Sequence, residues 1–213
     1  MSILLCAATD LEIAPTIDYL KTSGTDDVEI LITGVGLMSA TYHFTKKLTT
    51  LRPSMVIQAG VAGALENNLF LSQVVLVQNE MIGDMGVLEN GHFRSLIDLQ
   101  LIHPSSFPWI DGRLENKDIE KYKNHLQIVD GVTVNEISTN KDRIAHFRNL
   151  GVSIETMEGA ALHYVCLHEM ISFMQIRGIS NYIGERDKSQ WKLKEAISSL
   201  NVEVQKLITK QIV

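Results

Sequence analysis

Short apolar runs alternate along the chain with segments whose apolar residues recur every three or four positions. The strand-like apolar runs span residues 3–8, 28–33, 55–58, 74–77, 127–134 and 171–176. They predict β-strands covered on both faces, because a strand with one solvated face alternates apolar and polar residues. The periodic segments predict helices over about residues 37–51, 140–149, 158–169 and 190–212, and a further helix with Asp10 as its N-cap. The pattern indicates a single α/β domain across residues 1–213, with helices on both faces of a central sheet.

The segment 81–125 fits neither pattern. It holds three glycines before Phe93, followed by Pro104, Pro108 and Trp109. An irregular stretch of this length inside a compact domain usually carries function or an additional small element. We therefore expect this segment to form a lid or a wall at the substrate end of a site.

Composition and charge exclude several classes of protein. The 213 residues are 45% hydrophobic, enough for a sizeable core, and 19 basic against 25 acidic residues give a net charge of −6. This charge argues against a nucleic-acid partner. The longest apolar run is far shorter than the roughly 20 residues that span a membrane, and no Lys or Arg precedes Lys21 as a secretory signal would require. Cys6 and Cys166 lie in apolar segments, so we expect buried, reduced thiols and a cytoplasmic protein.

Four segments place polar or small residues where ligands gather in such sheets, next to strand ends and helix starts. They are Asp10 with Glu12, and residues 58–64, 155–161 and 177–181. Each also has a purely structural interpretation. The acids could favour a helix dipole, the glycines could permit a turn, and Arg177 with Asn181 could be surface groups.

Two other kinds of site are poorly supported. The Gly34/Gly36 pair has Ser39 where a dinucleotide fingerprint needs its third glycine. His163 and His168 are five positions apart on a predicted helix, which puts them on different faces. We expect no metal and no cofactor.

The order of these segments resembles the purine nucleoside phosphorylase and nucleosidase superfamily. The resemblance rests on Met157-Glu158 before small residues and on the run Arg177-Gly-Ile-Ser-Asn, and it spans nearly the whole chain. It implies a mixed central β-sheet. Within the superfamily, residues 179–187 followed by Trp191 are similar to the futalosine hydrolases of menaquinone biosynthesis, and the methylthioadenosine/S-adenosylhomocysteine nucleosidases are the nearest related class.

The resemblance implies a role for each matched residue. Glu12 matches the acid that activates water, Arg177 a buried arginine that orients the reacting groups, and Asn181 the position that faces the purine N7. Glu158 matches the acid that grips the ribose hydroxyls, and Met157 packs on the sugar. The remaining substrate contacts would come from Val134 and Asn135, which hold the base, and from Gly60 and Val61.

Two departures from the superfamily pattern refine the expected reaction. Phosphorylases hold phosphate with an arginine and a serine where this chain has Gln58 and Val61, so water is the expected nucleophile. Asn181 stands where adenosine-specific nucleosidases carry an aspartic acid; its amide favours hypoxanthine but can also pair with adenine.

The expected reaction is therefore hydrolysis of futalosine to hypoxanthine and dehypoxanthinyl futalosine. The alternatives are a methylthioadenosine/S-adenosylhomocysteine nucleosidase, a phosphorylase, or a noncatalytic purine-binding module. The resemblance implies a small-molecule nucleoside substrate and a homodimer or larger homo-oligomer. The substrate carboxylate would need a basic partner, for which Arg94, Arg113 and Arg186 are candidates.

Overall fold

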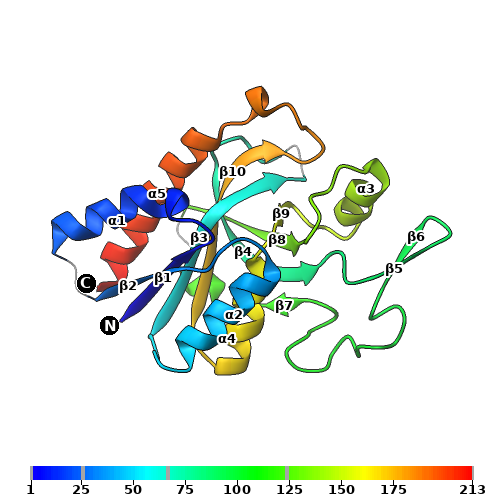
Figure 1. Cartoon of the computed structure of the whole chain (residues 1–213), viewed down its shortest axis with the longest axis horizontal. Coiled ribbons are helices and arrows are strands. Elements are labelled where there is room, and N and C mark those ends of the chain that lie inside the picture. Colours follow the sequence, from blue (N-terminus) through cyan, green and yellow to red (C-terminus); the bar gives the residue numbers. More distant parts are fainter. Residues whose placement is uncertain (1, 25–26, 66–67, 123–124, 213) are drawn as a thin grey trace.

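An eight-stranded mixed sheet forms the centre of the molecule, shown in Figure 1. The computed structural model describes residues 2–24, 27–65, 68–122 and 125–212. The strands are β1 (Ile3–Ala7), β2 (Val28–Ile32), β3 (Met55–Ala64), β4 (Val74–Ile82), β7 (Leu114–Glu115), β8 (Gln127–Thr133), β9 (Ile154–Thr156) and β10 (Phe173–Tyr182). Their order is β10-β4-β8-β9-β3-β1-β2, with β7 on β4.

The sheet closes on itself because β3 pairs with both β9 and β10. The strands β3, β10, β4, β8 and β9 thus form a ring of parallel and antiparallel pairs. Small and branched side chains fill its interior: Ala62, Ala64, Leu69, Val75, Val77, Val129, Ile154 and Ile179. Strands β1 and β2 extend the sheet from one side of β3.

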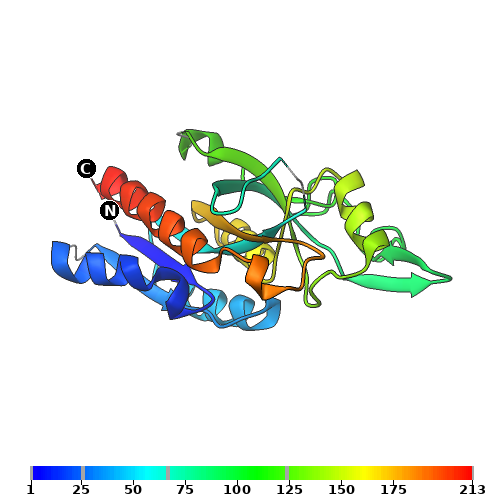
Figure 2. The ribbon, with the colours of Figure 1, turned by 90° about the horizontal axis from the view of Figure 1, so that it is seen from above.

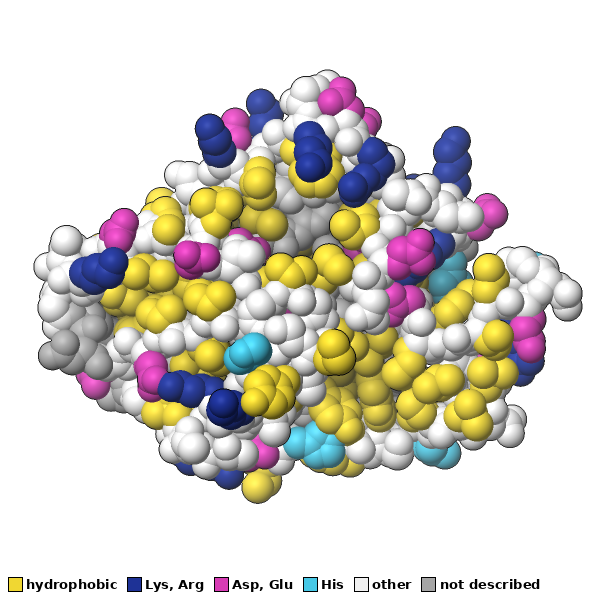
Figure 3. Space-filling view, in the orientation of Figure 1, with side chains coloured by type: hydrophobic (Ala, Val, Ile, Leu, Met, Phe, Trp, Pro, Cys, Tyr) yellow, Lys and Arg dark blue, Asp and Glu magenta, His cyan; other side chains and the backbone are white. Residues whose placement is uncertain are grey.

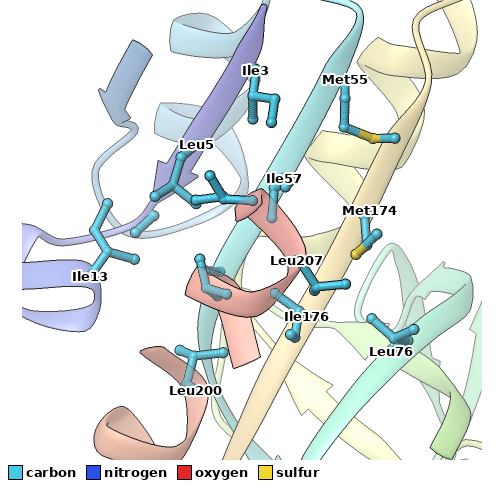
Figure 4. Close-up of a cluster of buried hydrophobic side chains, with 14 of the residues drawn as sticks. Ile3, Leu5, Ile13, Met55, Ile57, Leu76, Met174, Ile176, Leu200 and Leu207 are labelled. Carbon is cyan, nitrogen blue, oxygen red and sulfur yellow. The ribbon is translucent and has the colours of Figure 1, made fainter. Parts of the chain in front are cut away.

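Helices cover the sheet on both faces, as the continuous apolar runs predict. Helices α1 (Asp10–Ser23) and α5 (Leu193–Ile212) lie on one face, over the cluster shown in Figure 4 that includes Leu5, Ile57 and Leu200. Helices α2 (Leu37–Leu48) and α4 (Gly159–Glu169) lie on the other face, over side chains such as Leu4 and Val56. Helix α3 (Lys141–Asn149) packs on a separate small cluster.

Strands β3 and β10 are longer than predicted. The run 59–64, expected as a turn after a short strand, continues β3, and Arg177 to Asn181 lie within β10 rather than after it. The two strands pair with each other along almost their whole lengths, so the ladder holds residue types that strands otherwise disfavour. Two helix ends also differ: Thr9 rather than Asp10 is the N-cap of α1, and α2 ends at Leu48.

The segment 81–125 is more ordered than its sequence suggests. It contains the hairpin of β5 (Gly86–Glu89) and β6 (His92–Ser95), strand β7, and the 3-10 helix η1 (Ile119–Tyr122); residues 123 and 124 lie outside the described residues. Asn90 and Gly91 both have positive φ, as a tight hairpin turn requires. Figures 1 and 2 show the hairpin at one end of the molecule, away from α1 and α5.

Candidate active site

A cavity of about 300 Å³ opens where β3, β9 and β10 meet the first turns of α1 and α5. Figure 3 shows this face hollowed below the segment that joins β10 to α5. The cavity is lined by Ala8, Thr9, Leu11, Glu12, Val35, Val61, Ala62, Gly63, Ile137, Glu155, Thr156, Met157, Glu158, Ser180, Asn181, Ile183, Arg186, Trp191, Leu193 and Ile197. The lining combines an apolar surface with three carboxylates and one amide, as expected of a site for a small polar molecule.

Glu12 is held rigidly in the wall of this cavity. The backbone N–H and the hydroxyl of Thr9 donate to its Oε2 at 3.0 and 3.1 Å, and the Val61 N–H donates to its Oε1 at 3.0 Å. The contact with the Thr9 N–H caps the start of α1, a structural role other than the helix-dipole effect considered from the sequence. The contact with Val61 connects the same carboxylate to β3, which places it against the cavity.

Glu158 lies in the same cavity, next to Met157. The Gly36 N–H donates to its Oε1 at 2.8 Å. Burial raises the pKa of the Glu158 carboxyl, while the charge of Arg177 and the Gly36 bond act in the opposite direction. Glu12 and Glu158, which are 146 positions apart in the sequence, thus face one space.

Arg177 is buried beneath the carboxylates with 1% of its surface exposed, so the interpretation of it as a surface group is wrong. Its Nη2 donates to Gln58 Oε1 at 2.8 Å. A Cβ on Gly60 would lie 2.3 Å from Arg177 Nη1 and 2.9 Å from Glu12 Oε1. Gly60 is therefore needed to let the guanidinium approach β3 beside Glu12.

Asn181 presents a hydrogen-bond donor to the cavity. Its Oδ1 accepts from the Ser180 hydroxyl at 2.8 Å, and its Nδ2 donates to the Tyr182 carbonyl at 3.2 Å. The amide carries two N–H groups, so one is left over. The Tyr182 carbonyl can only accept a hydrogen bond, so it places Nδ2 on its own side of the amide. The single proton of the Ser180 hydroxyl lies within reach of both Asn181 Oδ1 and the Ala62 carbonyl, the latter at 3.2 Å.

Val134 and Asn135 do not line the cavity, in contrast to their expected contact with a base. Val134 is fully buried in the cluster around Phe147, and Asn135 donates from its backbone and side chain to Asp84. Asp84 accepts from the backbone N–H groups of Asn135 and Glu136, which lie in the loop after β8. Ile137, the next residue of this loop, lines the cavity.

The three candidate arginines lie in different surroundings. Arg186 lines the cavity with its guanidinium 5.5 Å from the centre of the Trp191 ring. Arg94 pairs with Glu89 in the hairpin, and Arg113 pairs with Asp130 at 2.6 Å. The described residues of segment 81–125 contribute nothing to the cavity lining.

Several lining residues were not among the candidates named from the sequence: Thr9, Ile137, Glu155 and Ile183. Two of them lie in segments that the sequence marked, Glu155 at the start of residues 155–161 and Ile183 within residues 179–187. The sequence carries no signal that separates these two from their neighbours.

The described residues offer neither a metal site nor a membrane-spanning helix. None of their His, Cys, Asp and Glu side chains form a group of three or more that could hold a metal ion. Within the same ranges, no helix has the length and apolar character needed to cross a membrane. Cys6 and Cys166 are both buried and free.

Comparisons with known proteins agree with this geometry. The sequence model of the phosphorylase superfamily matches residues 18–212. The futalosine hydrolase of Thermus thermophilus is 30% identical over 185 residues, which are 85% of this chain and 81% of that protein. The 5'-methylthioadenosine/S-adenosylhomocysteine nucleosidase of Glaesserella parasuis is 26% identical, covering 73% of this chain and 68% of that protein. The solved structure of Helicobacter pylori futalosine hydrolase superposes with a TM-score of 0.79 at 16% identity, covering 99% and 98% of the two chains.

Proposed function

We propose that this chain, which belongs to the phosphorylase superfamily, hydrolyses the N-ribosidic bond of futalosine. The products are hypoxanthine and dehypoxanthinyl futalosine, as in the route to menaquinone. One observation carries the proposal: Glu12, Glu158 and the donor of Asn181 line a single cavity. Hydrolysis of an N-ribosidic bond needs these three functions, because positive charge develops on the sugar and negative charge on the departing purine.

Glu12 acts as the general base. Its carboxylate accepts a proton from water as the water oxygen bonds to the anomeric carbon. Both of its oxygens are already oriented by Thr9 and Val61, so little rearrangement precedes reaction. Glu158 accepts hydrogen bonds from the ribose hydroxyls and stabilises the positive charge on the sugar, with Met157 packed beside it.

The electron pair of the broken bond leaves with the purine. Asn181 donates its free N–H to N7 or O6 and so stabilises the departing anion, which then takes its proton from water. Hypoxanthine offers two acceptors on this edge, whereas adenine offers one acceptor and one donor. The fixed amide therefore favours the 6-oxopurine.

Water rather than phosphate is the nucleophile. The Gln58 side chain is 1% exposed and bonded to Arg177, and Val61 has no hydroxyl for an anion. Arg177 is itself buried and holds Gln58, which leaves the guanidinium beneath the cavity as a positioning group for the carboxylates.

The direct test follows hypoxanthine release from futalosine by the purified protein in phosphate-free buffer. We expect turnover without phosphate, and slower release of adenine from methylthioadenosine. No hypoxanthine release refutes the proposal, strict dependence on phosphate supports a phosphorylase, and faster adenine release supports the adenosine-type nucleosidase.

Substitution of the proposed base separates catalysis from binding. Glu12→Gln is expected to lower kcat by about 10²–10⁴-fold while hypoxanthine still binds. Asp10→Asn is the matched control, because Asp10 is an exposed acid in the same helical turn and shares only the dipole effect. Near-native turnover of Glu12→Gln refutes the base assignment, and binding without any turnover in the wild type supports the noncatalytic module.

A homodimer or larger homo-oligomer is the proposed assembly, with segment 81–125 closing the substrate end of a neighbouring subunit's cavity. Several large apolar side chains of this segment and of α2 are exposed, including Leu101 at 71%, Phe107 at 68% and Met38 at 86%. Figure 3 shows hydrophobic side chains gathered between α2 and the hairpin. Light scattering after size-exclusion chromatography tests this proposal, and a monomer refutes it.

Cell fractionation tests the cytoplasmic location, which the two free, buried cysteines support.

A further inference from the structure

The third carboxylate in the cavity has no role in the reaction as described so far. Glu155 lies on β9, lines the cavity and is 4% exposed. Its Oε1 accepts from the Ser138 N–H at 3.0 Å. Its Oε2 is buried and has no hydrogen-bond partner among the described residues. A buried carboxylate oxygen without a donor costs stability, so such an oxygen beside a cavity indicates a donor supplied by a ligand.

The strand register places Glu155 in line with Asn181. Gly63 of β3 pairs with Glu155 on one side and with Asn181 on the other. Residues paired in this way point to the same face of a sheet, so both side chains rise from one row. Gly63 has no side chain between them, and the Ile183 side chain fills the space over it. The row therefore presents an acceptor and a donor on either side of an apolar floor.

This arrangement matches the polar groups of a 6-oxopurine. Hypoxanthine carries O6 and N7 as acceptors and, next to O6, the N1–H as a donor. Asn181 offers a donor for O6 and N7, and Glu155 Oε2 offers an acceptor for the N1–H. In a 6-aminopurine the polarity is reversed at both points, because N1 is an acceptor and the 6-amino group is a donor.

We propose that Glu155 selects the base by accepting the N1–H of a 6-oxopurine, and that Glu155 and Asn181 together exclude 6-aminopurines. The proposal rests on the proposed function, since it assigns the base specificity of that same cavity. Burial raises the pKa of the Glu155 carboxyl, while the side chain and N–H of Ser138 and the charge of Arg143 lower it. The hydrogen bond from the Ser138 N–H to Glu155 is structural, so a variant used as a test must keep this hydrogen bond.

Two substrates that differ only in the base provide the test. The ratio of kcat/KM for futalosine over kcat/KM for its 6-amino-6-deoxy analogue is measured for the wild type and for Glu155→Gln. Glutamine keeps an oxygen for the Ser138 N–H and turns the second atom into a donor. We expect the wild type to prefer futalosine by about 10²-fold or more, and the variant to lower this ratio by about tenfold or more. Glu136→Gln, a control at a side chain that is 86% exposed, should leave the ratio unchanged.

Binding of free bases to the wild type tests the same contact without a substitution. Calorimetry with hypoxanthine and 1-methylhypoxanthine isolates the N1–H, and methylation should weaken binding by about tenfold or more. Equal binding of the two bases, no measurable hypoxanthine binding, or a ratio in Glu155→Gln within twofold of the wild type overturns the proposal. A wild type that binds hypoxanthine selectively but does not cleave futalosine contradicts the proposed function and leaves the base assignment standing.

Discussion

Replacing Gly60 by alanine tests whether the packing of β3 against Arg177 positions the reacting groups. The added Cβ would lie 2.3 Å from Arg177 Nη1, about 1 Å short of ordinary contact, which begins near 3.4 Å. It would also lie 2.9 Å from Glu12 Oε1. Arg177 has little room to retreat, because its side chain is fully buried and bonded to Gln58. The collision must therefore displace the guanidinium, the Glu12 carboxylate or β3 itself.

Two effects are expected from Gly60→Ala. Overpacking of a buried site costs about 1–3 kcal/mol of unfolding free energy. A displacement of about 1 Å in a catalytic group costs about 10²-fold in rate, so kcat for futalosine should fall by that factor or more. Urea unfolding measures the first effect and hypoxanthine release measures the second.

Gly24→Ala is the control for a loss of stability alone. Gly24 caps α1 with a φ of +66° and has nothing within 4 Å of the added Cβ, so its cost of about 1–2 kcal/mol comes from the backbone only. It should lower stability to a similar extent and leave kcat unchanged. Native stability and near-native kcat in Gly60→Ala would refute the argument that this glycine positions Glu12 and Arg177.

Three more substitutions test other parts of the molecule. Burial raises the pKa of Glu80 from 4.5 to about 7, so its folded form holds a proton that the unfolded form loses, and stability falls as pH rises from 4.5 to 7. Glu80→Gln should remove up to about 3 kcal/mol of this fall, and an unchanged slope in urea unfolding between these pH values contradicts the burial argument. If the Arg186 guanidinium meets the substrate carboxylate, Arg186→Ala should raise KM for futalosine about tenfold and leave KM for inosine unaffected. Arg94→Ala is the control. Equal KM changes for both substrates argue against the contact. Ser180→Ala removes the hydroxyl that donates to Asn181 Oδ1 and leaves the Tyr182 contact as the remaining bond of the amide, so the preference for futalosine over its 6-amino analogue should drop several-fold. An unaltered preference shows that the Ser180 hydroxyl does not orient the amide.

The layers of the fold follow from the pattern of apolar residues along the chain. Continuous apolar runs require cover on both faces of a sheet, and the helical periodicity supplied that cover, so the α/β architecture followed from burial alone. Glu12 and Glu158 were identifiable through the resemblance to the nucleosidase superfamily, because the residues alone left the helix-dipole interpretation open for both. Asn181 and Arg177 were identifiable in the same way, although their strand was not.

The tertiary structure decided where the strands end and which residues share the cavity. Gly60 and Gly63 look like turn residues in the sequence, yet both lie inside β3. These two positions are glycines because only a bare backbone fits beside Arg177 and under Ile183. Their strand position depends on pairing with β10, more than a hundred residues away in the chain, which no local pattern records.

The chemical role of Glu155 is likewise not visible in its local sequence. Its sequence context is that of any acid before a helix, and its spacing from Met157 indicates only a shared face. The cross-strand row through Gly63 to Asn181 gives this carboxylate its partner, and burial leaves one of its oxygens without a donor. Local pattern thus determined which elements form and which acids mark the site, whereas long-range pairing decided which polar groups face each other, because hydrogen-bond partners in a sheet are set by register rather than by sequence distance.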